Sequence, residues 1–315
     1  MIGESCIAVA PCSTANLGPG YDVFGLALDA LEDKVKISRI TPAGNERISI
    51  KNSDQSIPSV AESNSAGLVV KKMMHDFRIS DSIEIEITKG VPPGYGIGSS
   101  AASATAAAIA FNALYGLKID KNSLVEYAAE GEFASAGIKH YDNVSASLLG
   151  GFVICSVSRG RLRFIRLEPP EDLVLVIAVP SLDVPNKKTE VARSVLPNMV
   201  PLKDVVHNVS GASTIVAGFA AKDVETITRG IDDVIIESAR KRLIPGYDNV
   251  KQTAISEGAL AVTISGAGPS MIAFLKTKKN AEAVAGGMIK GFAMTGIMSR
   301  TFICQASEGA RLLAQ

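Results

Sequence analysis

No excess of either charge, no long apolar run and no paired cysteines occur in these 315 residues, and each absence excludes a class of protein. Lys+Arg and Asp+Glu balance at 32 each, so the chain has no electrostatic bias toward nucleic acid or an anionic membrane. Apolar runs stay short of the ~18 residues of a membrane span, and the first ten residues contain Glu4 and lack the basic start of a signal peptide. We therefore expect a cytoplasmic protein whose partner is a small molecule, not a nucleic acid or a membrane.

The four cysteines are scattered, with no CxxC pair and no histidine cluster beside them. We expect reduced, mostly buried thiols at Cys6, Cys12, Cys155 and Cys304. With 47% hydrophobic residues over this length, two domains sharing a cleft are the natural expectation. Two adjacent prolines at 169 and 170 break regular structure, which predicts domains over residues 1–166 and 167–315.

A glycine-rich loop runs directly into an alanine-rich helix over residues 91–115. Its glycines permit positive φ and a close backbone approach, and Ser99 and Ser100 stand where the helix begins. Unpaired N–H groups and the helix dipole make such a corner an anion site. The helix carries no charge before Lys118, so it should be buried on nearly every face. The alternative is a flexible Gly/Ser linker before a core helix.

Two familiar phosphate motifs do not fit this loop, because it has no Walker A lysine and its glycines are spaced GxGxG rather than GxGxxG. PPGYGIGSSAAS instead resembles the central motif of the GHMP kinases. Near the start, PCSTANLGPGYDVFGLAL resembles their amino-terminal motif, and SGAGPS at residues 265–270 resembles the third. The segments HYDNV, TEVARSVLP and ESARKRLIPG extend the resemblance over the whole chain and are most similar to the homoserine kinase family.

The resemblance implies an ATP site. Asn64 would lie near the adenine, although an ordinary helix N-cap is equally compatible with the sequence. Lys89 would lie near the nucleotide, or would be solvated. The expected nucleotide-binding residues are Asn64, Lys89, Pro92, Pro93, Gly94, Tyr95, Gly96, Ile97, Gly98, Ser99, Ser100, Ala101 and Ala102.

Glu132 is the candidate metal ligand. In a helix over residues 122–137, a period of 100° per residue turns Glu126 and Glu130 away from the apolar side and leaves Glu132 at its margin. A solvated side chain is the alternative. In the resembled family this glutamate and a loop serine hold Mg²⁺, which here implies Glu132 and Ser100.

The resemblance also implies an acceptor pocket. Asn16, Asp22 and Asp142 can equally bond to local turns, and His140 can equally be a buried structural histidine. Arg193 and Arg240 would meet a substrate carboxylate, or would be solvated. The expected substrate-binding residues are Asn16, Asp22, His140, Asp142, Asn143, Thr189, Arg193, Arg240 and Gly266. We assign catalytic roles to four residues: Asp22, Asn143, Ser100 and Glu132. Either Asp22 or Asn143 would orient the acceptor hydroxyl.

The alternating patterns predict an α+β protein. Strands are expected at residues 5–10, 31–41, 46–51, 81–89, 152–157, 173–179, 259–265, 271–275 and 299–305, with 81–89 either edge-like or buried on one side only. A turn-rich loop is expected at 11–29, and helices at 63–77, 99–115, 122–137, 205–221, 232–243 and 280–288. The resemblance implies an S5-like amino-terminal domain and a ferredoxin-like carboxy-terminal domain.

The function that the resemblance implies is ATP- and Mg²⁺-dependent phosphorylation of L-homoserine by a homodimer. Two alternatives stay open at this point. One is a GHMP kinase for another acidic alcohol, such as shikimate, pantoate or a mevalonate derivative, and the other is a regulator that binds nucleotide or amino acid without catalysis.

Overall fold

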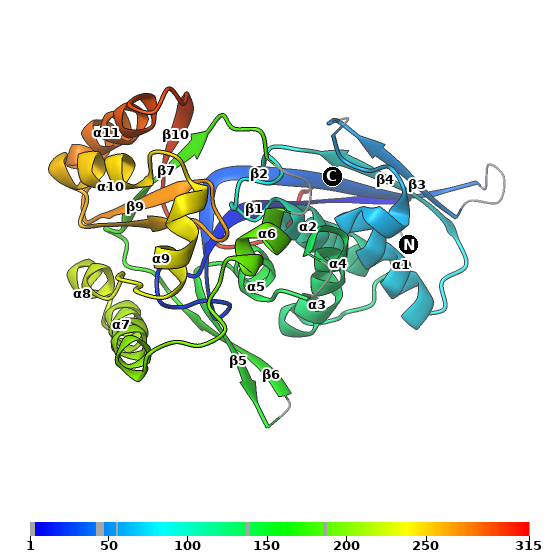
Figure 1. Ribbon diagram of the computed structural model, residues 1–315. Helices are drawn as coiled ribbons and strands as arrows, with labels where there is room; N and C mark the ends of the chain where they lie inside the picture. Colours follow the sequence, from blue (N-terminus) through cyan, green and yellow to red (C-terminus); the bar gives the residue numbers. More distant parts are fainter. Residues whose placement is uncertain are drawn as a thin grey trace.

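The computed structural model describes residues 4–41, 47–54, 56–136, 139–159, 161–184 and 188–314. Two sheets organise these residues, each covered by helices, and the expected α+β class is confirmed (Figure 1). No helix in these ranges combines the length and the hydropathy that a bilayer crossing needs. All four cysteines are free, and three of them are buried.

The first sheet has the strand order β11-β1-β2-β4-β3, and β5 and β6 extend it from β2. Its strands are β1 (Ser5–Ala15), β2 (Phe24–Ile40), β3 (Ile48–Asn52), β4 (Ser82–Thr88), β5 (Phe152–Ser158), β6 (Arg161–Leu167) and β11 (Arg311–Leu312). The helices of this half are α1 (Ser65–Asp76), α2 (Ser99–Leu114), α3 (Lys121–Ala128), α4 (Phe133–Ala136) and α5 (Asp142–Leu149), with short 3-10 turns η1 (Ala61–Ser63) and η2 (Ala129–Glu132).

The second sheet has the order β10-β7-β9-β8, and all its neighbouring strands are antiparallel. Its strands are β7 (Val174–Pro180), β8 (Ala261–Ile264), β9 (Met271–Leu275) and β10 (Ser299–Cys304). Around it lie α6 (Lys188–Ser194), α7 (Leu202–Ala221), α8 (Val224–Arg229), α9 (Ile236–Arg240), η3 (Lys241–Leu243), α10 (Tyr247–Ser256), η4 (Lys278–Asn280) and α11 (Ala281–Ala293). Numbered within this sheet, the strand order is 4-1-3-2, which is the ferredoxin-like arrangement that we expected.

Helix α2 is the buried axis of the first half, as its composition predicts. It packs against β1, β2, α1 and α5, and every residue of it is buried except Ser99, Ser100, Asn112 and Ala113. Small side chains allow this close approach on several faces, and uncharged ones make it possible without unpaired charges. The buried helix therefore fixes where the glycine loop before it meets the sheet.

Three sequence-based expectations are wrong. The supposed loop at 11–29 is mostly strand, because β1 runs on to Ala15 through a bulge after Pro11 and β2 already begins at Phe24. Of the two alternatives for residues 81–89, the edge strand is wrong, since β4 lies between β2 and β3. The one-sided strand fits, because the isoleucines of β4 are buried and the residues that alternate with them are more exposed. Glu46, the first residue of one expected strand, lies outside the described residues.

The third error concerns helix continuity. The helix expected at 122–137 is interrupted by η2, and Gly131 there lies so close to α2 that a Cβ would be 2.7 Å from the Cβ of Ala104. The helix expected at 232–243 starts only at Ile236, because the carboxylate of Asp233 accepts hydrogen bonds from the N–H groups of Ile235, Ile236 and Glu237. Local sequence periodicity does not register either contact.

Residues near the end of the chain return to the first sheet. Strand β11 pairs with β1, the N–H of Ser307 donates to the carbonyl of Ala27, and the N–H of Leu313 donates to the carbonyl of Ile7. The domain boundary between residues 166 and 167 stays a prediction. Residues 307–313 follow that boundary in the sequence but contact the first sheet.

Candidate active site

A cavity of about 850 Å³ lies where the two halves meet. Its walls come from the loop after β1, the start of α1, the glycine loop, η2, the start of α5, the residues around α6, and the turn after β8. It is lined by Ala15, Asn16, Tyr21, Asp22, Ser56, Ile57, Pro58, Ser63, Asn64, Ser65, Lys89, Pro93, Gly94, Tyr95, Gly96, Gly98, Ser99, Ser100, Ser103, Glu132, Ala134, His140, Asp142, Asn143, Leu182, Asp183, Val184, Lys188, Thr189, Arg193, Arg240, Gly266 and Ala267.

The glycine loop needs its glycines for both conformation and space. Gly94, Gly96 and Gly98 have φ of 87°, 76° and 70°, which is the left-handed region. A Cβ on Gly96 would lie 2.4 Å from the carbonyl oxygen of Ser265, and one on Gly98 would lie 2.1 Å from the Oγ of Ser13. Gly98 is the N-cap of α2, and Gly98, Ser99 and Ser100 line the cavity. An anion bound at this helix start stays a prediction.

Four expected nucleotide residues do not line the cavity. The side chains of Ile97, Ala101 and Ala102 are buried in the core, and Pro92 is also absent from the walls. Because these side chains are apolar and face away, only the backbone at these positions could contact a ligand. At these four positions the predicted nucleotide contact is therefore limited to backbone atoms.

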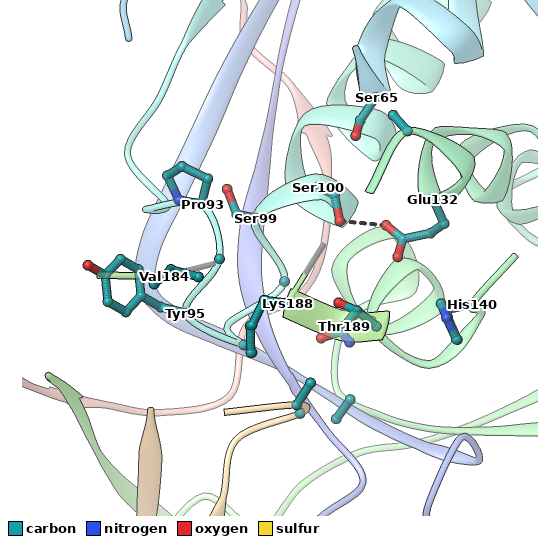
Figure 2. A pocket seen from close by; sticks show the side chains of 18 of the residues that line it. Ser65, Pro93, Tyr95, Ser99, Ser100, Glu132, His140, Val184, Lys188 and Thr189 are labelled. Atoms are coloured by element: carbon teal, nitrogen blue, oxygen red, sulfur yellow. Dashed lines mark hydrogen bonds between the residues drawn. The ribbon is translucent and has the colours of Figure 1, made fainter. Parts of the chain in front are cut away.

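Ser100 and Glu132 meet at the cavity wall. The Oγ of Ser100 donates a 2.6 Å hydrogen bond to Oε1 of Glu132, as Figure 2 shows. Glu132 is 6% exposed, and burial raises the pKa of its carboxyl to about 7, although the Ser100 bond opposes the shift. Glu130, two residues earlier, instead pairs with Lys139 at 2.7 Å. The inward-facing glutamate is therefore the one that the helical period selected.

The Ser100 and Glu132 pair fits Mg²⁺ by its donor chemistry. Both side chains offer oxygen, and Mg²⁺ in nucleotide sites is usually held by one or two carboxylates together with phosphate oxygens and water. Within the described ranges no group of three or more His, Cys, Asp and Glu side chains could hold a metal. Phosphate oxygens and water would supply the remaining ligands.

Lys89 is engaged in a buried ion pair. Its Nζ contacts the carboxylate of Asp33 and donates to the carbonyl of Ser99 at 3.1 Å and to Oγ of Ser103 at 3.0 Å. The other oxygen of Asp33 accepts from the N–H groups of Gly90 and Val91, both at 3.0 Å. The pair therefore ties both ends of the glycine loop together. Lys89 touches the cavity but is not solvated, and its nucleotide contact stays a prediction.

Asn64 satisfies both interpretations of its sequence. Its Oδ1 accepts from the N–H of Gly67, so it is the N-cap of α1, and its Nδ2 donates to the carbonyl of Pro58 at 2.7 Å. It also lines the cavity. The cap fixes the wall there without excluding a contact with the base.

Asp22 and Arg193 form an ion pair in another part of the cavity wall. Nη2 of Arg193 lies 2.8 and 2.7 Å from the two oxygens of Asp22 and 3.0 Å from Nδ1 of His140. Burial, and then the charge of Arg193, lower the pKa of His140. Its Nε2 is buried with no partner in the described part of the chain. Arg193 is thus not an isolated solvated side chain.

Arg240 is only 3% exposed, so a solvated helix end is wrong for this residue. Its Nε donates to the carbonyl of Ala192 and its Nη1 to the carbonyl of Gly266 at 3.2 Å. Its guanidinium lies 5.1 Å from the ring centre of Tyr21, and that of Arg193 lies 5.4 Å from the same ring. The ring therefore brings the two arginines together.

Two asparagines and one aspartate lie in the same part of the cavity wall: Asn16, Asn143 and Asp142. Nδ2 of Asn16 donates to the carbonyl of Gly266, and its Oδ1 accepts from the N–H of Asp22. Burial and the nearby charge of Asp22 raise the pKa of Asp142 to about 6. Asn143 accepts a 2.9 Å hydrogen bond from Oγ of Ser13. These side chains make structural hydrogen bonds and also line the cavity. A structural role and a place in the acceptor pocket are therefore compatible for them.

All nine expected substrate residues line the cavity. The sequence did not point to Tyr21, Asp33 or Lys188. Tyr21 stands beside Asp22 inside the amino-terminal motif, which was the one available signal. Asp33 and Lys188 lie among other charged residues, and only the folded chain distinguishes them.

Comparisons with known proteins agree with this geometry. Family models for the GHMP kinases N terminal domain and the GHMP kinases C terminal match residues 64–151 and 215–293. Among similar proteins, the homoserine kinase of Thermoplasma volcanium is 38% identical over 306 residues (97% of this chain, 96% of that protein), and that of Methanopyrus kandleri is 43% identical over 271 residues (85% and 87%).

Solved structures extend the comparison. The crystal structure of homoserine kinase from Cytophaga hutchinsonii has a TM-score of 0.91 and 35% identity, covering 99% of this chain and 98% of that one. Mevalonate kinase from L. major, solved with R-mevalonate, shares the fold at a TM-score of 0.72 and 14% identity, covering 98% and 97%. The expected two-domain fold is therefore confirmed, and the chain belongs to the homoserine kinase family of the GHMP kinases, which are ATP-dependent kinases of small molecules.

Proposed function

We propose that the protein transfers the γ-phosphoryl group of ATP to the side-chain hydroxyl of L-homoserine and forms O-phospho-L-homoserine and ADP. One observation carries this proposal: a single cavity is lined both by the glycine loop with the start of α2 and by the Asp22 carboxylate beside two arginines. The second part of this lining complements an amino acid zwitterion, since a carboxylate suits the ammonium group and guanidinium groups suit the carboxylate.

At the phosphate end, the N–H groups of the glycine loop and the first turn of α2 would hold the phosphates. Ser100 and Glu132 would hold Mg²⁺, which when bound neutralises charge on the phosphate oxygens. The Asp33–Lys89 pair keeps the loop in its binding conformation. The adenine would lie toward Asn64.

At the acceptor end, the Asp22–Arg193 ion pair would open to admit the substrate. The ammonium group then contacts Asp22, while the carboxylate contacts Arg193 and Arg240. This exchange replaces one ion pair with two, so the charges of the pocket stay balanced. Asn143 or Asp22 would orient the hydroxyl, and Thr189 and His140 would close the pocket around it.

In the transfer step, a bond forms between the homoserine hydroxyl oxygen and the γ-phosphorus, and the bond from that phosphorus to the bridging oxygen of ADP breaks. Phosphoryl transfer proceeds through a loose transition state, so alignment and charge neutralisation contribute more than a strong base. The hydroxyl proton then passes to an oxygen of the transferred phosphoryl group.

The test is ADP release from Mg-ATP over a panel of L-homoserine, shikimate, pantoate, mevalonate and L-threonine. We expect turnover with L-homoserine well above all others. Turnover with another alcohol and none with L-homoserine would reject the substrate but keep the kinase. No turnover with any alcohol, together with nucleotide binding, would favour a regulatory protein.

We also propose a cytoplasmic homodimer. Supporting it, Leu202, Val206 and Val209 form a stripe along α7 and are 77%, 61% and 59% exposed. Such a row of apolar residues on one helix face suits contact with another chain. Sedimentation of the parent protein and of Val206→Glu tests this proposal, which predicts a dimer for the former and a monomer for the latter.

A further inference from the structure

Lys188 is a cation at the cavity wall with no role so far. It is the first residue of α6, and its side chain lines the cavity together with Thr189 and Arg240. Figure 2 shows Lys188 and Thr189 in the pocket that also holds Ser100 and Glu132. Burial first, and then the charge of Arg240, lower the pKa of Lys188 to about 7.

Two other cations of the cavity have carboxylate partners. Lys89 pairs with Asp33, and Arg193 pairs with Asp22. No described carboxylate lies within ion-pair distance of Lys188, although Arg240 is close enough to depress its pKa. Two cations held close together in a poorly hydrated wall repel each other, and an anionic ligand between them would relieve this cost.

The segment before α6 contacts the glycine loop. The carbonyl of Leu182 accepts from the hydroxyl of Tyr95 at 3.2 Å. Val184 lies against Gly94, where a Cβ would come within 2.7 Å of its Cγ1. Both residues line the cavity together with Lys188, so this wall is continuous with the expected phosphate site.

Arg240, the second cation, is connected to the same loop through Gly266. Arg240 donates to the carbonyl of Gly266, and Gly266 lies against Gly96, whose carbonyl oxygen would be 2.9 Å from an added Cβ. Lys188 therefore lines the same cavity as Ser100, at the expected phosphate site, and Arg240, at the expected carboxylate site. A phosphoryl group that moves between these two sites would pass through this cavity.

We propose that Lys188 binds the phosphoryl group that is transferred, in the nucleotide-bound state and during its passage to the acceptor. This inference rests on the proposed function for the direction of transfer. A lysine suits the role because a compact ammonium on a flexible stem can follow a moving phosphoryl group, whereas a guanidinium favours one fixed planar contact. The other anion within reach is the carboxylate of the acceptor, and the experiment separates the two.

The first measurement is nucleotide affinity by calorimetry without divalent metal. Lys188→Ala and Lys188→Met should weaken binding of the non-hydrolysable ATP analogue AMP-PNP by roughly 10- to 150-fold, the range for one lost charge-assisted contact. Their affinity for ADP should stay within about threefold of the parent, because ADP lacks the γ-phosphoryl group. Lys290→Ala, on an exposed face of α11, is the matched control and should change neither value.

The second measurement is turnover on L-homoserine and on 3-aminopropan-1-ol, which has no carboxylate. Lys188→Met should lose the same factor in kcat/KM on both acceptors. A loss confined to L-homoserine would assign Lys188 to the carboxylate and overturn the proposal. An equal loss of AMP-PNP and ADP affinity, or no loss of either, would also overturn it.

The affinity measurement does not depend on the proposed function. If no acceptor is phosphorylated but the AMP-PNP and ADP affinities still separate, the substrate assignment fails while the phosphoryl contact stands. Thermal unfolding of each variant checks the fold, and Lys188→Met keeps the apolar stem where Lys188→Ala removes it.

Discussion

Glutamine at position 132 should make the free protein more stable at alkaline pH than the parent protein. Burial raises the pKa of Glu132 from 4.5 to about 7 in the folded state. A folded-state pKa above the unfolded one means that the native state holds the proton more tightly. The free energy of unfolding is therefore fully supported below pH 4.5 and declines as the pH rises toward 7.

The magnitude follows from the same shift. At ~1.4 kcal/mol per pH unit, the rise from 4.5 to about 7 corresponds to about 3 kcal/mol of lost stability at pH 8. Glutamine has nearly the same shape and no charge at either pH. The difference in the free energy of unfolding between Glu132→Gln and the parent should therefore be about 3 kcal/mol more favourable to the variant at pH 8 than at pH 4.5.

The assay is urea unfolding of the metal-free and nucleotide-free proteins at pH 4.5, 6 and 8. Glu130→Gln is the matched control, since Glu130 is in the same 3-10 turn and pairs with Lys139 instead of facing the cavity wall. Its stability should change little, as for a surface ion pair. A Glu132→Gln difference that stays constant from pH 4.5 to pH 8 would refute the reasoning.

The same variant should fail in catalysis. If Glu132 holds Mg²⁺ during transfer, Glu132→Gln loses kcat by a much larger factor than it loses ATP affinity, because the lost charge neutralisation acts mainly in the transition state. Steady-state kinetics at saturating Mg²⁺ measure this. A variant that is more stable and retains parental kcat would remove Glu132 from the site.

Three further predictions concern the loop and the arginines. Gly98→Ala should abolish nucleotide binding or folding, whereas Gly116→Ala, with a similar positive φ but nothing within 4 Å of an added Cβ, should cost only about 1 kcal/mol in urea unfolding. Arg193→Ala should raise the pKa of His140, since the arginine charge lowers it after burial does, and an NMR titration follows this easily in a chain with 3 histidines. Arg240→Lys should lose roughly 10- to 150-fold in kcat/KM on L-homoserine and little on 3-aminopropan-1-ol, whereas an equal loss on both would reject the carboxylate contact.

The sequence predicted best where the physics is local. The glycine loop, the start of α2 and the inward side chain of Glu132 depend on backbone conformation and helical period, and both are read from neighbouring residues. The resemblance then supplied residues far apart in the chain, such as Asp22 and Arg193, whose contact no spacing rule predicts. Their roles in binding the substrate stay predictions.

Prediction failed where tertiary contacts decide. Gly131 packs against α2 and interrupts a helix that its own sequence would continue, and Asp233 delays the start of α9. Asp33 and Lys188 are equivalent in sequence to many surface charges. Only burial, which depends on the whole fold, makes one the anchor of the glycine loop and the other a cation without a described carboxylate partner.

The pairing of β11 with β1 has a consequence for synthesis on the ribosome. Residues 306–313 bond to strands and turns within the first 30 residues and to the segment at 147–151. The amino-terminal sheet therefore lacks its border strand until the whole ferredoxin-like half has been translated. During that time the free edge of β1 is open to pairing with other chains. Removal of residues 306–314 should consequently promote aggregation through the amino-terminal half, even though the deleted residues belong to the other end of the sequence.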